Sequence, residues 1–440
     1  MKIGFVSLGC SKNLVDTEVM LKRLADAGYT ITPDETEADI IVVNTCGFIQ
    51  SAKEEAIDNI LDVAWLKKNR SLKGIIATGC LVERYREQVL EEMPEVDAAL
   101  GTGSYHKIVE AVEAVARGEK YASFEDKNEA PLGGEHIVTT PPYTAYLKVA
   151  EGCDNRCTYC AIPLIRGRMR SRRIEDVVAE AKALEKIGVK ELNIIAQDTS
   201  RYGLDLYGKY MLPELVQKIL AETQIPWIRL LYLYPDKITD ELVAVIRDND
   251  RVCKYVDLPI QHVSDTVLAR MNRHGDGAVV RAAVEKIRRE IPGVTLRTTA
   301  IVGFPGETEE QFAELCEFVK ETGFDRFGAF TYSPEEGTPA AEFPDQIDEQ
   351  VKQDRYDTLM AVQLAVSEKK MQERLGDVVE VLCEGYDPVA GVQYGRSRAD
   401  APDVDGKVYF TSAKKLPEGV FVNVKITKAL DYDLFGEAVR

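Results

Sequence analysis

Six of the nine cysteines in this 440-residue chain fall into two groups of three. The tighter group lies in the segment EGCDNRCTYC, where Cys153, Cys157 and Cys160 have CxxxCxxC spacing. Thiolates are the usual ligands of iron–sulfur clusters, and this spacing lets one loop bind a single cluster. Three ligands leave one iron of a four-iron cube open. The alternative is zinc, but a structural zinc site usually has a closed fourth ligand, and no histidine lies near this loop.

The second group is Cys10, Cys46 and Cys80, each of which ends an apolar, strand-like run. Because the carboxyl ends of strands in an open α/β sheet share one edge, these three thiols could meet in space. The alternative is three unrelated thiols at strand ends. Glycines adjoin all three, and the room they leave for close backbone approach favours a bulky ligand. These glycines are Gly9, Gly47 and Gly79.

The elements around the cysteines predict an α/β protein of three domains. Strand-like and helical runs alternate in the first 130 residues, which predicts an open parallel sheet, and a proline- and glycine-rich linker follows at 121–143. Six further strand-like runs, separated by helical stretches, predict a barrel or partial barrel with its chemistry at the carboxyl ends of the strands. Short strands after residue 374 predict a small antiparallel β-barrel of OB type. The expected domains are 1–135, 143–371 and 372–440.

Three cysteines remain outside the two groups. Cys253, Cys316 and Cys383 stand singly in apolar runs, where cysteine usually serves as a small buried hydrophobe.

Charge and hydropathy limit the partners. Lys and Arg number 55 against 73 Asp and Glu, a net charge of -18, and no domain is net basic. Such a surface disfavours free nucleic acid as a partner. No apolar run reaches the ~18 residues of a membrane span, and no secretory signal is visible, so we expect a cytoplasmic protein without a membrane partner.

Two charged segments bear on the choice of partner, and the first of them is a local exception to the acidic charge. One is arginine-rich, and its side chains could bind a substrate or cofactor carboxylate, bind RNA phosphates, or begin a solvated helix. These arginines are Arg166, Arg168, Arg170, Arg172 and Arg173. The other is an acidic loop of the terminal β module with Asp400, Asp403 and Asp405, which predicts poor RNA binding and steering of a basic protein partner.

The Cys153–Cys160 loop resembles that of the radical S-adenosylmethionine superfamily. With the second triad, the barrel and the terminal β module, the whole chain is similar to the methylthiotransferase family, whose last domain is a TRAM domain. Segments such as SLGCSKNLVDTE and DLPIQHVSDTVLARMNRHG resemble the members that modify ribosomal protein S-twelve (uS12). The tRNA-modifying members usually read GCQMN where this chain reads GCSKN.

The resemblance implies two 4Fe–4S clusters and S-adenosylmethionine as cofactors. The auxiliary cluster, on Cys10, Cys46 and Cys80, would hold a sulfur that one S-adenosylmethionine methylates. A second molecule, cleaved at the other cluster, would supply a radical that removes hydrogen from the β-carbon of an aspartate in the ribosomal protein. An electron donor and a sulfur source would be further partners. The alternatives are a tRNA adenosine methylthiotransferase and a non-enzymatic RNA-binding iron–sulfur protein.

Four residues are candidates for binding the cofactor. Tyr159 matches the family's aromatic position near the adenine, although core packing is the alternative. Gln197 and Asp198 end a barrel strand, where they would contact the ribose or methionine part or merely cap a helix. Gly303, in the segment VGFPGETEE, would bring backbone to the cofactor or only form a turn. No further side chain is assigned a catalytic role.

Overall fold

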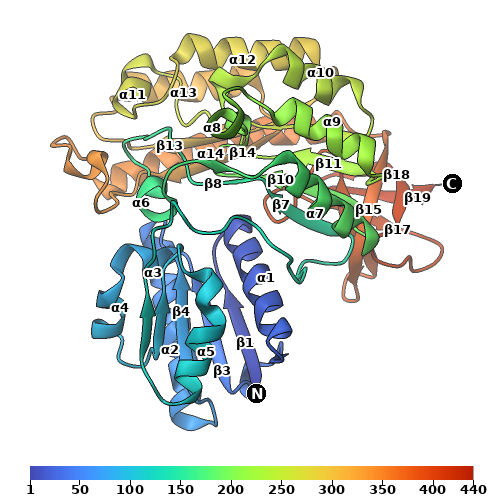
Figure 1. Ribbon diagram of the computed structural model, residues 1–440. Coiled ribbons are helices and arrows are strands. Elements are labelled where there is room, and N and C mark those ends of the chain that lie inside the picture. Colours follow the sequence, from blue (N-terminus) through green and yellow to red (C-terminus); the bar gives the residue numbers. More distant parts are fainter. Residues whose placement is uncertain (440) are drawn as a thin grey trace.

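The N-terminal domain is an open parallel sheet with helices on both faces (Figure 1). The structure is a computed structural model that describes residues 1–439. β3 (Ile40–Thr45) is buried along its whole length, with Ile40 and Val42 packed on one face and Ile41 and Val43 on the other. Burial on both faces explains why this strand is a continuous apolar run. In spatial order the strands are β2 (Thr30–Ile31), β1 (Lys2–Ser7), β3, β4 (Gly74–Gly79), β5 (Ala98–Leu100) and β6 (Tyr121–Ser123). The helices are α1 (Ser11–Asp26), α2 (Gln50–Asn69), α3 (Cys80–Tyr85), α4 (Glu87–Glu92) and α5 (Ile108–Ala116).

Two local features of this domain differ from expectation. Residues 121–123 form the sixth strand, β6, so the linker begins after them. The helical run expected after β4 is divided into α3 and α4 at Arg86, whose φ is 44°. A left-handed residue cannot continue a right-handed helix, so the chain turns there.

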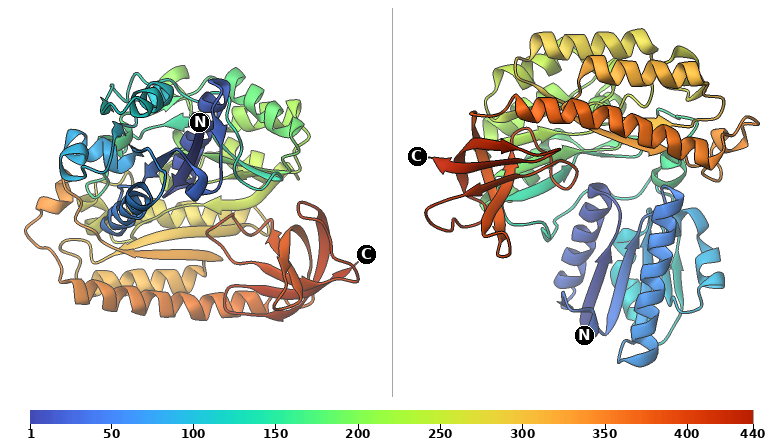
Figure 2. Two further views of the ribbon diagram at one scale, coloured as in Figure 1. Left: turned by 90° about the horizontal axis from the view of Figure 1, so that it is seen from below. Right: turned by 180° about the vertical axis from the view of Figure 1, so that it is seen from behind.

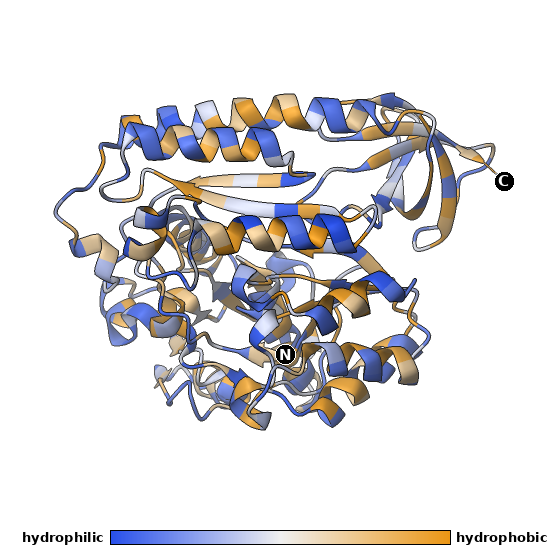
Figure 3. Cartoon of the chain, turned by 90° about the horizontal axis from the view of Figure 1, so that it is seen from above, coloured by the Kyte–Doolittle hydropathy of each residue, from blue (hydrophilic) through white to orange (hydrophobic). Residues whose placement is uncertain are grey.

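The central domain is a six-stranded parallel sheet whose strands follow one another in chain order, which confirms the partial barrel. Helices cover its outer face (Figure 1), and they alternate hydrophobic and hydrophilic residues along their length (Figure 3). The strands are β7 (Thr144–Lys148), β10 (Glu191–Ile195), β11 (Trp227–Leu230), β12 (Val252–Asp257), β13 (Thr295–Val302) and β14 (Arg326–Thr331). The main helices are α7 (Ile174–Lys186), α9 (Leu212–Glu222), α10 (Asp240–Asp248), α12 (Gly277–Glu290), α13 (Glu309–Thr322) and α14 (Glu349–Gln372). Shorter elements are α6 (Ile162–Arg166), α8 (Leu204–Tyr207), α11 (Asp265–Arg270) and the antiparallel pair β8 (Ala150–Glu151) and β9 (Arg170–Ser171). Within residues 1–439, none of the helices is long and apolar enough to cross a lipid bilayer.

The C-terminal domain is a closed five-stranded β-barrel, as expected, but one of its strand pairs is parallel. In ring order its strands are β15 (Val378–Asp387), β16 (Val392–Ser397), β17 (Val408–Thr411), β19 (Leu434–Val439) and β18 (Phe421–Ala429). Strand directions cannot alternate all the way around a ring of five, so one adjacent pair must be parallel. That pair is β17 and β19.

Most of the acidic loop of this β-barrel is not a free surface: the expectation that it steers a partner is wrong for Asp400 and Asp405, whose side chains are buried, while Asp403 is exposed. Asp400 pairs with Arg326, and Asp405 accepts a hydrogen bond from the hydroxyl of Tyr255 at 2.6 Å. Asp403 accepts one from Tyr146 at 3.1 Å. The loop therefore fastens the β-barrel to the central sheet, and α14 leads from the central domain into the β-barrel (Figure 2).

The linker between the first two domains is held by His136. Its Nδ1 lies 2.9 Å from Glu18 of α1 and its Nε2 lies 3.3 Å from Glu180 of α7, so one side chain joins both domains. Burial alone would lower the pKa of His136, but the two carboxylates outweigh it and raise the pKa from 6.5 to about 9.

This clamp predicts a pH-dependent stability. Because the folded pKa lies above the unfolded value of 6.5, the stabilisation is complete below pH 6.5 and disappears as the pH rises through about 9. Its size is on the order of 3 kcal/mol. We expect the urea midpoints of the wild type and His136→Gln to differ at pH 6 and to converge by pH 9.5. His274→Gln, at an exposed position, is the control. A constant gap across this range would contradict the clamp.

Candidate metal and cofactor site

The N-terminal cysteines meet at one edge of the sheet, as the sequence predicts. Cys10, Cys46 and Cys80 follow β1, β3 and β4, which are adjacent strands. A Cβ placed on Gly9 would lie 2.8 Å from the Cβ of Cys46, and one on Gly47 would lie 2.6 Å from the Cα of Leu81. The glycines therefore let the three cysteine-bearing loops pack against one another.

The three thiols differ in their electrostatic surroundings. Burial raises the pKa of Cys80 to about 12 and also raises that of Cys46. Desolvation opposes ionisation of Cys10, but Lys12 and Arg166 outweigh it and lower the pKa of this thiol. Because iron binds the thiolate, occupation of this site would release protons.

The central cysteine loop follows β8 at the carboxyl end of the central sheet and is held by side chains from the next strand ends. Asn155 donates to Asp198 at 2.7 Å and lies 3.5 Å from the sulfur of Cys153. Arg201 donates to Asn155 at 2.8 Å. The hydroxyl of Tyr234 lies 3.1 Å from the sulfur of Cys157. Hydrogen-bond donors beside ligand sulfurs are a common second layer of iron–sulfur sites.

Sequence reasoning missed Asn155 and Tyr234. Asn155 lies inside the cysteine loop, and Tyr234 follows β11, so both positions carried a signal in hindsight. What hid them was the ordinary chemistry of their side chains, which are common in loops.

Helix α6 connects the two triads. It begins two residues after Cys160, and its last residue, Arg166, places Nη2 3.4 Å from the sulfur of Cys80. Cys80 also packs against Ala161 and Ile165. The two cysteine groups, which are 73 residues apart at Cys80 and Cys153, are therefore neighbours in one site.

Gln197 and Asp198 lie at the base of this site. Gln197 Nε2 donates to Glu151 at 2.5 Å, and its Oε1 is buried without a hydrogen-bond partner among residues 1–439. Asp198 accepts from Asn155 and from Ser200, and it makes no side-chain bond to the backbone of the short helix that follows it. Gln197 thus has one acceptor atom, Oε1, that could bond to a ligand, while Asp198 supports the cysteine loop.

Tyr159 and Gly303 occupy positions with local structural roles. Tyr159 is partly buried against an apolar cluster that includes Phe304 and Met271. Gly303 has φ of +72°, a Cβ there would lie 2.3 Å from Lys352, and its N–H donates to Glu307 at 2.6 Å. These contacts favour the turn interpretation for Gly303 and leave the adenine contact of Tyr159 as a prediction.

The arginine-rich segment is not a continuous patch. Arg166 and Arg172 are buried, with 2% and 7% exposure, and Arg172 pairs with Glu180 at 2.6 Å. Only Arg168 and Arg173 are exposed. The expectation of a phosphate-binding patch or a solvated helix start is therefore wrong for the buried arginines, and Arg166 binds carboxylates of this chain.

The donor sets fit two iron–sulfur cubes. Each triad offers three thiols, and N–H or O–H donors lie beside Cys80, Cys153 and Cys157. Among the described residues, no three His, Cys, Asp or Glu side chains converge closely enough to hold a single metal ion. In a cube each thiolate binds a different iron, so its protein ligands stand farther apart than those of a mononuclear ion.

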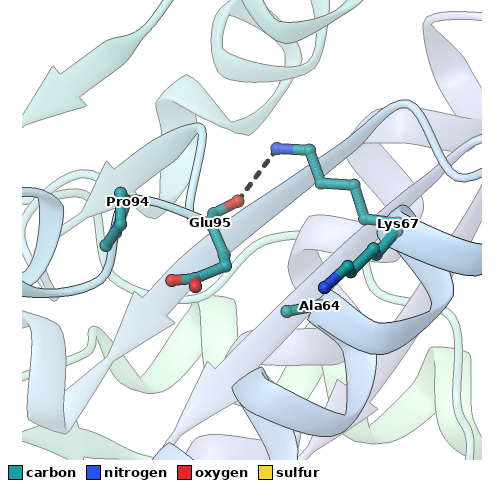
Figure 4. Close-up of a pocket in the computed structure, with 5 residues that line it drawn as sticks. Ala64, Lys67, Pro94 and Glu95 are labelled. Atoms are coloured by element: carbon teal, nitrogen blue, oxygen red, sulfur yellow. Dashed lines mark hydrogen bonds between the residues drawn. The ribbon is translucent and has the colours of Figure 1, made fainter.

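A surface pocket elsewhere in the N-terminal domain does not belong to this site. Its lining comes from the end of α2 and the loop before β5, and Lys67 donates to the carbonyl of Glu95 there at 2.9 Å (Figure 4). Since these segments precede strands, the pocket lies at the edge of the sheet opposite the cysteines.

Comparisons with known proteins cover nearly the whole chain. Three family models match: "Uncharacterized protein family UPF0004" at residues 2–101, "Radical SAM superfamily" at 147–319 and "TRAM domain" at 375–439. The radical S-adenosylmethionine methyltransferase TsrM from Kitasatospora setae has the same fold over 83% of this chain and 89% of its own, with TM-score 0.58 and 13% identity.

Curated relatives are much more similar. "Ribosomal protein uS12 methylthiotransferase RimO" from Desulforamulus reducens is 51% identical over 100% of this chain and 99% of its own length. The protein of that name from Thermoanaerobacter sp. (strain X514) is 49% identical over 99% of each chain. With this identity over the full length of both proteins, and with a cysteine triad in each of the first two domains, the chain belongs to the RimO family of radical S-adenosylmethionine methylthiotransferases.

Proposed function

We propose that this chain transfers a methylthio group to the β-carbon of an aspartate in ribosomal protein uS12. The observation that carries the proposal is the placement of two cysteine triads in one site, joined by α6, in a chain that is similar over its full length to RimO proteins. The clusters and S-adenosylmethionine supply, when bound, the radical that removes hydrogen and the sulfur and methyl group that replace it. A C–H bond of this kind lies outside the reach of side-chain acid–base chemistry.

The side chains of the site have separate tasks in this proposal. Cys153, Cys157 and Cys160 hold one cluster and leave one iron for the cofactor, while Asn155 and Asp198 keep their loop in place. Gln197 Oε1, the buried acceptor without a partner, fits an N–H or O–H of S-adenosylmethionine. Tyr159 and Gly303 stay candidates for the adenine side of the same cofactor.

The auxiliary cluster is assigned to Cys10, Cys46 and Cys80. Their position beside α6 brings the sulfur to be transferred close to the place where the radical forms. An electron donor and a sulfur source are further partners that this chemistry requires, and a ribosomal substrate places the enzyme in the cytoplasm.

Two observations favour a protein substrate over tRNA. The net charge is -18. Two of the five arginines of the arginine-rich segment, Arg166 and Arg172, are buried in ion pairs with this chain's own carboxylates, so the segment offers no continuous phosphate-binding patch. Ribosomal proteins are typically basic, so charge complementarity favours them.

A competition experiment tests the substrate. Reconstituted enzyme is offered uS12 and bulk tRNA together under anaerobic, reducing conditions, and methylthio incorporation is measured in each by mass spectrometry. We expect modification of uS12 and none of tRNA. A uS12 variant with asparagine in place of the target aspartate is the control. Modification confined to the tRNA would reject the proposal in favour of a tRNA adenosine methylthiotransferase.

A further inference from the structure

Four charged side chains are buried together where the N-terminal domain meets the central domain. Asp16 comes from α1, Lys148 from β7, Glu151 from β8 and Arg166 from α6, and all are less than 10% exposed. Arg166 Nη1 lies 2.5 Å from Asp16 and 3.3 Å from Glu151, and Lys148 Nζ lies 2.6 Å from Glu151 and also pairs with Asp16. Two cations and two carboxylates make this group neutral as a whole.

Arg166 extends from this group to the N-terminal triad. Its Nη2 lies 3.4 Å from the sulfur of Cys80 and donates to Oδ1 of Asn13 at 3.0 Å. Asn13 in turn donates to the carbonyl of Leu8 at 2.7 Å and lies 3.3 Å from the carbonyl of Thr45. These carbonyls belong to the segments just before Cys10 and Cys46, so a single guanidinium is connected to all three cysteine-bearing loops.

The same guanidinium is connected to the central site. Glu151, which lies 3.3 Å from Arg166, accepts from Gln197 at 2.5 Å, and it lies two residues before Cys153. The helix α6 begins two residues after Cys160 and ends at Arg166. Arg166 therefore touches both halves of the site without occupying a ligand position in either.

A guanidinium beside a ligand sulfur has a definite electronic effect. Reduction adds negative charge to a cluster, and a positive N–H donor at the sulfur stabilises that charge and raises the reduction potential. The effect is strong here because Arg166 is 2% exposed and water screens it weakly. The carboxylate of Asp16 opposes it, since it offsets the same positive charge.

We propose that Arg166 is a positioning residue with two effects. Through its contact with Cys80 it raises the reduction potential of the auxiliary cluster, and through Asp16 and Glu151 it fixes the position of that cluster relative to the radical site. The inference rests on the proposed function, because it assumes a cluster on the N-terminal triad. It makes two separable claims, one about potential and one about coupling between the two reactions.

The potential is tested with two variants that damage the same ion pair but change its charge in opposite senses. Arg166→Gln leaves the buried group with one excess negative charge, and Asp16→Asn leaves it with one excess positive charge. We expect the auxiliary cluster's potential to fall in the first and rise in the second. It is measured by redox titration with electron paramagnetic resonance in the full chain carrying Cys153→Ala, Cys157→Ala and Cys160→Ala, so that one cluster remains.

Arg172→Gln is the matched control. Arg172 belongs to the same segment and is buried, but its guanidinium bonds to Glu180 and to the carbonyl of Lys148 and to no cysteine among residues 1–439. We expect this variant to be destabilised with no change in potential. If the role of Arg166 were purely structural, Arg166→Gln and Asp16→Asn would shift the reduction potential of the auxiliary cluster in the same direction, or neither would change it.

Coupling is tested in the chain with all six cysteines. We expect Arg166→Gln to form 5′-deoxyadenosine while methylthio product per deoxyadenosine falls about 10–100-fold. An unchanged ratio would overturn the coupling claim.

The remaining outcomes are also decisive. If Arg166→Gln fails to fold, Arg166→Lys and Asp16→Asn are compared instead. One ammonium group cannot contact both Asp16 and Cys80, so we expect the reduction potential of the auxiliary cluster to be lower than in the wild type for Arg166→Lys. We expect it to be higher than in the wild type for Asp16→Asn. A shift of the reduction potential in the opposite direction in either variant overturns the inference. A wild-type chain that holds only one cluster would reject the proposed function itself, whereas two clusters with unmoved potentials would reject this inference alone.

Discussion

Replacing Cys10, Cys46 and Cys80 together with alanine is expected to lower the iron content of the reconstituted chain from about eight to about four atoms. The variant should still cleave S-adenosylmethionine to 5′-deoxyadenosine, because the central loop keeps its three thiols and its contacts through Asn155 and Asp198. Methylthio transfer should stop, since no site remains for the sulfur. Iron analysis, deoxyadenosine chromatography and mass spectrometry of uS12 measure the three results.

Cys316→Ala is the control for this experiment. Cys316 lies on α13 beside the central core, away from both triads, and its loss should leave all three measurements unchanged. Full iron content in the triple variant would show that the N-terminal cysteines bind no cluster.

Cys153→Ala is expected to abolish 5′-deoxyadenosine formation altogether. The loop would keep two thiols for a cluster whose remaining iron must hold the cofactor and pass it an electron. The N-terminal triad lies on a different domain and its own sheet edge, so it should still bind about four iron atoms.

Asn155, which holds the cysteine loop in place, provides a variant to compare with Cys153→Ala. Asn155→Ala keeps every cysteine but removes the bond to Asp198, so it should retain iron and reduce deoxyadenosine formation only in part. Undiminished deoxyadenosine from Cys153→Ala would show that the radical chemistry does not occur at this loop.

The strands and the cysteine groups were predictable because their signals are local. A run such as that of β3 reports burial on both faces through its own residue types, and the CxxxCxxC spacing confines three thiols to one loop. The parallel sheets and the five-stranded module follow from the same kind of pattern. The domain boundaries at 135, 143 and 371 stay predictions.

The charged residues were the least predictable part. The acidic loop was expected to face a partner, and the arginine-rich segment to face solvent or a ligand, but Asp400, Asp405 and Arg166 are buried against another domain. Their partners lie far away in the chain: Asp400 pairs with Arg326, 74 residues distant, and Arg166 with Asp16, 150 residues distant.

By itself, the sequence determined most of the strands and helices, which cysteines stand at strand ends and which family the chain resembles. Only the tertiary structure decided that the two triads form one site, that Arg166 lies between them and that the acidic loop closes an interface. The physical reason is that hydrophobic periodicity records which face of an element is buried, whereas whether a charged side chain can be buried, and whether it then stabilises the fold, depends on what lies opposite it. That partner is supplied by domain docking, which no local pattern encodes.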